Sequence, residues 1–348
     1  VGSEKKVRNY VLLSDGAENT APMVADVIHL FQNLRDDEIH HIHTIAFGSG
    51  ADQSQMSWIA NETDGVYLYT PDRNNPLELM NIFNTIQNEI SDVQTIGNVE
   101  YYIDEPDVQE HVFTVDETIS EEVITLIWDE EWDQLDLELE TPNRTVITSD
   151  NWQNFPYVNF VEGPSIQYFT LEGPELGDWL ARVTAVNTNY DGSNYGLVFT
   201  ADSDLLMSVD FDADDYTVND RIKISAELVY SDAPIIGSTV TAEIEVPSAR
   251  ERAINRELEL IKQSEDQLSE NRIQIIEDKY AHLDNQRNSI NIVLMDDGIH
   301  GDGAADDGIY SNYFYDTNDP GTYDFLVEAT GDVGLANDFM RRSTRSIY

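Results

Sequence analysis

The sequence predicts a multidomain protein in which an α/β segment is followed by two β-sandwiches, the last of which carries an inserted helical hairpin. Short apolar runs alternate with helix-like periodicity over the first part of the chain, which is typical of a parallel sheet covered by helices. From about residue 97 apolar and polar residues alternate, with turn signals every 8–12 residues or so, which is typical of antiparallel sandwiches. We therefore expect domains over residues 1–96, 97–204 and 205–348.

The first domain is expected to alternate strands and helices in a doubly wound arrangement. Its strands are short apolar runs, as in a sheet that is buried on both faces. Its helices show apolar residues at helical spacing, and Pro76 opens the last one at a position where its missing N–H costs nothing. The predicted strands are 7–14, 42–47 and 65–69, and the predicted helices are 21–35, 53–61 and 76–91.

The two sandwiches are predicted from strands in which every second residue is apolar. The second sandwich is expected to be of the immunoglobulin-like kind. The predicted strands are 123–128, 135–140, 168–171, 179–184 and 195–199 in the first sandwich, and 222–228, 239–246, 290–294 and 321–329 in the second.

Residues 248–288 contain neither glycine nor proline, and this predicts a helical hairpin inserted in the last domain. Ile254, Leu258 and Ile261 fall on one helical face, and a second apolar face follows in the other half. The turn is expected near 269–271. Two interpretations stay open: a solvated excursion that caps the sandwich, or a docking arm for another subunit.

The charge of the chain excludes two classes of partner. With 67 acidic and 19 basic residues the net charge is −48, so nucleic acid and anionic membrane surfaces would be repelled. No run approaches the roughly 18 apolar residues of a membrane span, so membrane insertion is not expected. The acidity fits a surface adapted to salt or divalent cations, or a set of specific Ca²⁺ sites.

The chain contains no cysteine, so an extracellular form would take its rigidity from packing or from bound metal. It opens on Val1 and passes almost directly into a strand, and no signal peptide is visible. We expect a processed or excised piece of a longer product.

A loop at 296–308 is the strongest candidate for a metal site. Carboxylates this close repel one another unless a cation lies between them, and its four glycines let backbone carbonyls turn inward. We predict a structural Ca²⁺ site, with a solvated turn and a catalytic metal as alternatives; the terminal glutamate of an EF-hand is absent. The candidate ligands are Asp296, Asp297, Asp302, Asp306 and Asp307, beside His300.

A second acidic cluster, at Asp210, Asp212, Asp214 and Asp215, is expected to be solvated. His40, His41 and His43 flank a predicted strand, where a structural role is expected rather than ligation.

Three segments of the first domain resemble the second half of a von Willebrand factor type A domain: 11–19, 42–52 and 59–67. The resemblance implies that Asp15, in Ser14-Asp15-Gly16, belongs to a metal-ion-dependent adhesion site that binds Mg²⁺ or a similar cation. The family's first metal loop, Asp-x-Ser-x-Ser, does not occur in this sequence. An upstream segment or another chain would therefore have to complete the site; alternatively, Asp15 only caps the following turn.

The β-rich part resembles the region after the type A domain in calcium-activated chloride channel regulators and their prokaryotic relatives. The resemblance is carried by Ile127-Trp128, Pro142-Asn143, Gly177-Asp178-Trp179 and the 296–308 loop. It implies a modular protein that is secreted or attached to the cell surface.

Three functions follow as hypotheses. The first is a non-enzymatic, calcium-binding adhesion or interaction protein with a protein or glycan ligand. The second is a structural subunit of an extracellular filament or surface layer, joined to copies of itself. The third is a hydrolase, although the sequence lacks the usual nucleophile, zinc and phosphate-loop motifs. Asn61 and Asn143 begin glycosylation sequons.

Overall fold

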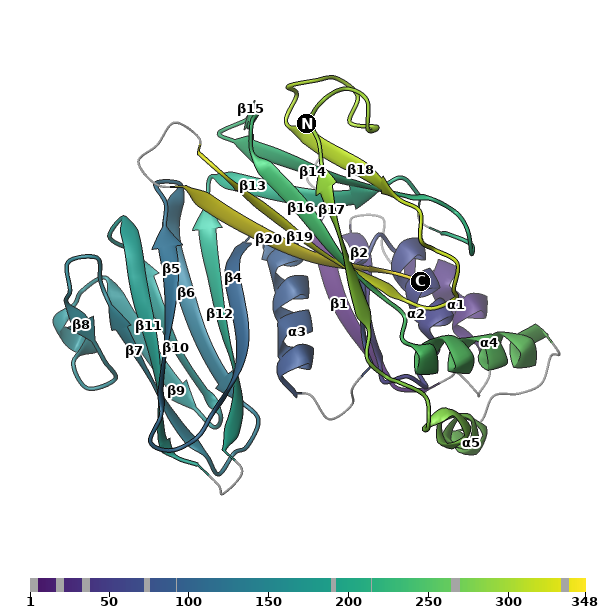
Figure 1. Ribbon diagram of the computed structural model, residues 1–348, viewed down its shortest axis with the longest axis horizontal. Coiled ribbons are helices and arrows are strands. Elements are labelled where there is room, and N and C mark those ends of the chain that lie inside the picture. Colours follow the sequence, from purple (N-terminus) through teal and green to yellow (C-terminus); the bar gives the residue numbers. More distant parts are fainter. Residues whose placement is uncertain are drawn as a thin grey trace.

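The computed structural model describes residues 6–16, 22–32, 38–71, 76–91, 93–188, 192–213, 215–263, 270–332 and 338–348. Strands dominate this part of the chain and form four sheets, while the helices are few (Figure 1). The prediction of a β-rich protein with several sheets is confirmed.

The α/β segment is a parallel sheet of order β1-β2-β3, with helices on both faces. Ala46 packs with α2, whereas its neighbour Ile45 packs with α3, because consecutive strand residues point to opposite faces. Ends of the predicted helix 21–35 lie outside the described residues. The elements are β1 (Lys6–Ser14), α1 (Val24–Gln32), β2 (Glu38–Phe47), α2 (Gln53–Glu62), β3 (Tyr67–Thr70) and α3 (Pro76–Ser91).

The first sandwich encloses one continuous apolar core that includes Trp179, Phe169 and Tyr195. One layer has the strand order β4-β12-β6-β10-β9 and the other β5-β11-β7-β8. The elements are β4 (Gln94–Ile103), β5 (Val108–Val115), β6 (Ile119–Trp128), β7 (Gln134–Glu140), β8 (Val146–Ile147), η1 (Trp152–Asn154), β9 (Val158–Gly163), β10 (Ile166–Glu172), β11 (Gly177–Asn187) and β12 (Ser193–Ser203).

The second sandwich has its own core, which includes Phe325 and Phe339. One layer is β17-β16-β19-β20, and the other is β13-β14-β15 with β18 also paired to β14. The elements are β13 (Leu205–Phe211), β14 (Ile222–Tyr230), β15 (Ala233–Pro234), β16 (Thr239–Val246), β17 (Asn288–Leu294), β18 (Ile309–Phe314), β19 (Tyr323–Gly331) and β20 (Phe339–Ile347).

One sheet runs through both sandwiches. Strand β20 of the second sandwich joins β4 of the first through the residue pair Arg342 and Thr95, giving nine strands in one sheet. The sequence did not predict this continuity, because the pairing joins segments that are far apart in the chain.

The inserted hairpin consists of α4 (Ala249–Gln263) and α5 (Glu270–Tyr280). Its helices share a small apolar core that includes Ile254, Leu258 and Ile276. The predicted turn at 269–271 is placed too late, because α5 already begins at Glu270. Residues 264–269 lie outside the described part of the chain.

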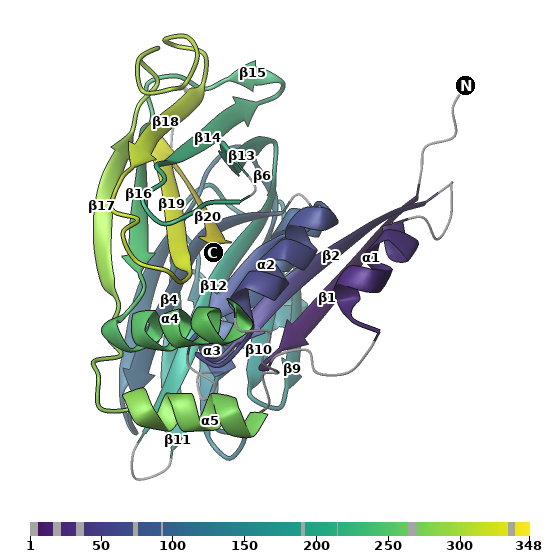
Figure 2. The ribbon, with the colours of Figure 1, turned by 90° about the vertical axis from the view of Figure 1, so that its right-hand side faces the viewer.

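The hairpin lies beside the α/β segment, as both views of the ribbon show (Figure 2). Ser49, just after β2, donates a hydrogen bond to Glu277 of α5 at 3.0 Å. At the base of the hairpin Arg287 forms a buried ion pair with Asp324 and lies over the ring of Tyr69. The hairpin therefore packs between the last sandwich and the carboxyl ends of the parallel strands.

Candidate functional site

The acidic loop connects β17 to β18 at one end of the second sandwich. Backbone bridges between Met295 and Ser311 and between Asp297 and Ala305 close its base. Positive φ angles at its glycines and at Asp306 (60°) allow the tight turns that follow. The loop is thus a compact structure that contains all five predicted carboxylates.

Most of these carboxylates bind backbone N–H groups of the loop itself. Asp296 accepts hydrogen bonds from the N–H groups of Asp307 and Gly308, both at 3.1 Å. Asp307 accepts from Ala304 at 3.2 Å and from Ile309 at 3.1 Å. These hydrogen bonds fix the conformation of the loop.

The side chain of His300 lies against Asp297, with Nδ1 2.9 Å from Oδ2. This hydrogen bond, together with those from backbone N–H groups, lowers the pKa of Asp297 below its ordinary value. Asp297 is therefore ionised and already has its own partner.

Asp302 differs from the other acids of the loop because it is buried, with 3% of its surface exposed. Its Oδ2 accepts from the N–H of Gly298 at 2.6 Å, whereas its buried Oδ1 has no partner. A buried carboxylate oxygen without a donor is costly, and a cation would relieve that cost. Within the described ranges, however, no three His, Asp or Glu side chains come together in a way that could hold a metal ion.

Asp15 lies at the carboxyl end of β1 and is exposed. The neighbouring Asp52 caps α2: its Oδ1 accepts from Gln55 N–H and from Ser54 Oγ, each at 3.1 Å. The two loops meet where Asp52 N–H donates to the Gly16 carbonyl at 3.4 Å. Asp15 and the acidic loop thus belong to different parts of the fold, the first to the parallel sheet and the second to the second sandwich. Asp15 lies at the carboxyl end of its strand, where ligands of α/β sheets bind.

Several of the remaining predicted residues have hydrogen-bond partners. Asn61 Nδ2 donates to Asp215 at 3.5 Å, and Asn143 Nδ2 donates to Glu175 at 2.7 Å. Asp212 accepts from Tyr216 and from the N–H of Lys223, and Asp214 lies outside the described residues. These contacts leave the glycosylation of Asn61 and Asn143 as a prediction.

His43 is buried between two partners: Val66 N–H lies 3.1 Å from its Nδ1, and its Nε2 lies 3.2 Å from Asn9 Oδ1. Burial lowers the pKa of this imidazole. The contacts agree with the structural role expected for the strand histidines.

Strand β1 corrects the prediction of a buried strand at 7–14, because side chains on both of its faces are exposed. Val7, Val11 and Leu13 share the α3 face and are 50%, 43% and 44% exposed. Tyr10 contacts Phe31 of α1 on the other face, yet is 42% exposed. Since parallel sheets are normally covered on both faces, this edge has apolar side chains that the described residues do not cover.

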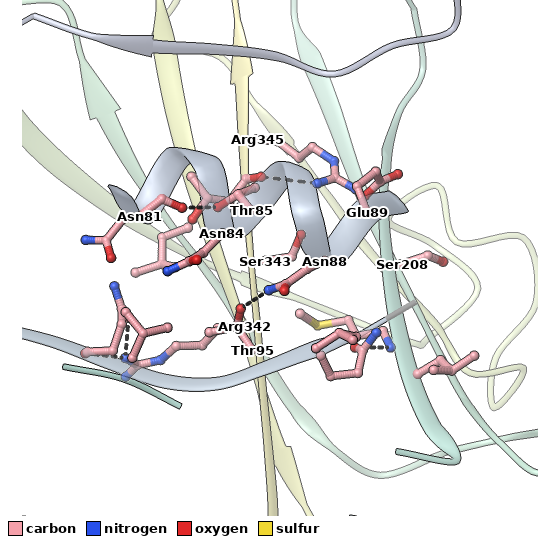
Figure 3. Close-up of a pocket in the computed structure, with 18 of the residues that line it drawn as sticks. Asn81, Asn84, Thr85, Asn88, Glu89, Thr95, Ser208, Arg342, Ser343 and Arg345 are labelled. Carbon is pink, nitrogen blue, oxygen red and sulfur yellow. Dashed lines mark hydrogen bonds and ion pairs between the residues drawn. The ribbon is translucent and has the colours of Figure 1, made fainter. Parts of the chain in front are cut away.

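A polar cleft of about 360 Å³ lies where α3, β4, β13, β14 and β20 meet (Figure 3). Side chains of Asn81, Asn84, Asn88 and Thr85 form its α3 wall, and Arg342 and Arg345 of β20 lie opposite. This cleft could not be predicted from the sequence, because its lining also includes residues of β12 and β19 and most of its segments are far apart in the chain. The spacing of the three asparagines along one helix face was the only available signal.

Residues 246–348 match the family model described as the second immunoglobulin-like domain of conditioned medium factor. The match covers the hairpin and strands β17 to β20, and agrees with the β-sandwich predicted there. No curated protein matches the chain.

Solved structures give only distant likenesses. A DUF4785 family protein from Legionella pneumophila is 9% identical, covering 73% of this chain and 64% of that one, with a TM-score of 0.39. Trypsin-activated alpha-2-macroglobulin from Escherichia coli is 14% identical over 73% of this chain and 16% of that one, with a TM-score of 0.24. A von Willebrand factor type A protein from Catenulispora acidiphila is 10% identical over 64% and 38%, with a TM-score of 0.20. This chain spans less than two thirds of each of them.

Proposed function

We propose that this chain is a non-catalytic interaction protein, secreted or on the cell surface, whose α/β segment binds a strand of another polypeptide. The observation that carries the proposal is the exposure of β1 on both faces. Val7, Val11 and Leu13 would each lose apolar surface to a covering segment, which is favourable by about 25 cal/mol per Å² buried. A strand edge also offers free backbone N–H and C=O groups for pairing.

The charge of β1 indicates what kind of strand would fit. The described part of this strand carries Lys6 and Arg8 and no acid, within a chain of net charge −48; Arg8 already pairs with Glu38 of β2 at 3.1 Å. An acidic strand with apolar alternate residues would complement Lys6 and the apolar side chains of β1. If that polypeptide also carries the missing metal loop, Asp15 would supply one carboxylate to a Mg²⁺ adhesion site.

The proposal can be tested with a synthetic strand peptide in which valine alternates with glutamate. Hydrogen exchange of the β1 amides is measured on the full chain with and without the peptide. We expect slower exchange in β1 when the peptide is added, and no effect from the same peptide with a central proline, which cannot pair.

Two results would test whether β1 binds a strand. Val11→Lys places a charge in the apolar strip and should abolish the protection, while Val161→Lys on the exposed face of β9 should leave it intact. Full protection of β1 amides in the free chain would mean that this edge is already covered, and would refute the proposal.

We further propose that Ca²⁺ at the 296–307 loop stabilises the second sandwich, with Asp302 as the central ligand. Support comes from the unpartnered buried Oδ1 of Asp302 and from the nearby Asp296, Asp297, Asp306 and Asp307. Oxygen-rich flexible loops are what Ca²⁺ prefers.

The second candidate is a subunit of an extracellular filament or surface layer, and the hairpin favours it. Leu260 and Ile275 are each 66% exposed there, so they could pack against another copy. Sedimentation in calcium separates the candidates: long polymers would favour the filament, and a monomer would favour the interaction protein.

A further inference from the structure

We propose that the cleft between α3 and the second sandwich binds a neutral saccharide. This site is separate from β1, so the inference goes beyond the function proposed above and does not depend on it. Three features of the cleft support saccharide binding: unpaired polar groups, no free cation among its described lining residues, and a blocked strand edge.

The first feature is a set of polar groups that point into the cleft without a partner. Asn88 Nδ2 donates to Thr95 Oγ1, but the half-buried amide of Asn84, one turn earlier on α3, has no hydrogen bond in the described part of the chain (Figure 3). The hydroxyl of Ser343 on the β20 side is likewise unpaired there. A ligand with both donors and acceptors would satisfy these groups.

The second feature is the charge of the walls. Arg342 donates to Glu328 at 2.7 Å, and Arg345 pairs with Glu89, so both guanidinium groups are neutralised. Glu227 of β14 also lines the cleft and is exposed. The cleft therefore has no unpaired cation, among the residues described, to attract an anion.

A carboxylate such as that of Glu227 accepts strong hydrogen bonds from hydroxyl groups. Ser208 lies directly opposite Glu227 on the neighbouring strand, so its hydroxyl reaches the same side of the cleft. Adjacent hydroxyls of a sugar ring can donate to Glu227 and exchange hydrogen bonds with Ser208 and Asn84. The volume of about 360 Å³ is in the range of small-ligand sites and suits a short saccharide.

The third feature argues against a peptide. Peptides commonly add to a free strand edge, and β13 is the edge strand that borders the cleft. That edge is already used: Met207 N–H donates to Gln94 Oε1 at 3.0 Å, and the Leu205 carbonyl accepts from Arg341 Nε at 3.2 Å. A peptide backbone would have to displace both contacts.

The test is calorimetric titration of the full chain with lactose, cellobiose and diacetylchitobiose as neutral probes. Sialyllactose serves as the anionic probe, and a glycine–serine peptide as the peptide probe. We expect at least one neutral saccharide to bind and the other two classes to bind more weakly or not at all.

Variants assign the binding to the cleft. Glu227→Ala and Asn84→Ala should each weaken it about tenfold or more, because each removes a hydrogen bond to the ligand. Both positions leave the core intact, and Asn159→Ala, an exposed asparagine of β9, is the matched control with unchanged affinity. The proposal is overturned if no neutral saccharide binds, if sialyllactose or the peptide binds better, or if the two cleft variants bind like the control.

Discussion

Glu122 shows how strongly a single residue of this protein is constrained by its surroundings. It belongs to β6, is fully buried, and neither carboxyl oxygen has a hydrogen-bond partner. Burial raises the pKa of Glu122 well above its ordinary value, and Asp116 adds to the rise while Arg341 opposes it. Burial thus favours the neutral acid form of this side chain inside the first sandwich.

Replacing Glu122 with glutamine should remove a pH dependence of stability. The unfolded chain releases this proton near pH 4.5, whereas the folded chain retains it, so the free energy of unfolding falls as pH rises through the interval between the two pKa values. Glu122→Gln should abolish that decline and be more stable than the parent at neutral pH. Urea unfolding across pH measures this.

The control for that experiment is Glu121→Gln, since the adjacent side chain points to the opposite face of β6. A parent and a Glu122→Gln variant with the same pH profile would contradict the prediction.

Helix α4 of the hairpin begins with a capping box. Ser248 Oγ accepts from Glu251 N–H at 3.1 Å, and Glu251 accepts from Ser248 N–H at 2.7 Å. Both residues are buried. This pair fixes where the chain leaves β16 and enters the hairpin.

Ser248→Ala should lower the free energy of unfolding by about 1 kcal/mol, since one helix N–H loses its acceptor. Chemical denaturation of the full chain measures the loss. Ser289→Ala, in the exposed part of β17, should leave stability unchanged; equal effects of the two substitutions would argue against a role for the cap.

A second prediction concerns the acidic loop. If Ca²⁺ binds there, millimolar Ca²⁺ should raise the midpoint of thermal unfolding and a chelator should lower it, because the unfolded chain lacks the site. Asp302→Asn should abolish the shift, while Asp332→Asn outside the loop should keep it. An unchanged midpoint of thermal unfolding in the parent chain would refute the calcium proposal.

Single elements also show what the sequence could and could not predict. Helix α3 and most of the predicted strands follow from local periodicity, which needs only neighbours in the chain. Strand β20 was not predicted, because Arg341, Arg342 and Arg345 make its sequence look polar. Arg341 is nevertheless fully buried, since Asp116, Thr118 and Ser203, from distant segments, bind its guanidinium.

The candidate sites divide in the same way. The 296–308 loop was found as a candidate because its carboxylates are contiguous in the sequence. The cleft escaped prediction because Asn84, Glu227 and Ser343 meet only after folding. The apolar run of β1 was correctly predicted as a strand, but the run itself does not show whether other segments pack against its two faces.

At the scale of the whole molecule, Arg341 connects the two sandwiches. It extends from β20 of the second sandwich to Asp116, between β5 and β6 of the first, at 2.9 Å. Both side chains are almost fully buried. The two cores therefore share one ion pair that neither could complete alone.

Arg341→Met should destabilise the protein by about 3–5 kcal/mol, because it leaves Asp116 buried without its partner. Adding Asp116→Asn should recover part of the loss, as the second buried charge is then also removed. Differential scanning calorimetry measures both variants. Arg144→Met is the control with little change, because the Arg144 side chain is 81% exposed and its partner Glu140 keeps Arg182. A small loss in Arg341→Met would show that the pair is not needed to join the sandwiches.

The nine-stranded sheet has a mechanical consequence. Most of its neighbouring strands are joined along many residues, but β20 and β4 are joined at one pair, Arg342 and Thr95. Tension between the two sandwiches would concentrate at this seam, which would open before either core unravels. The polar cleft lies on the same seam, so a molecule held there would brace the joint and make the protein stiffer under load.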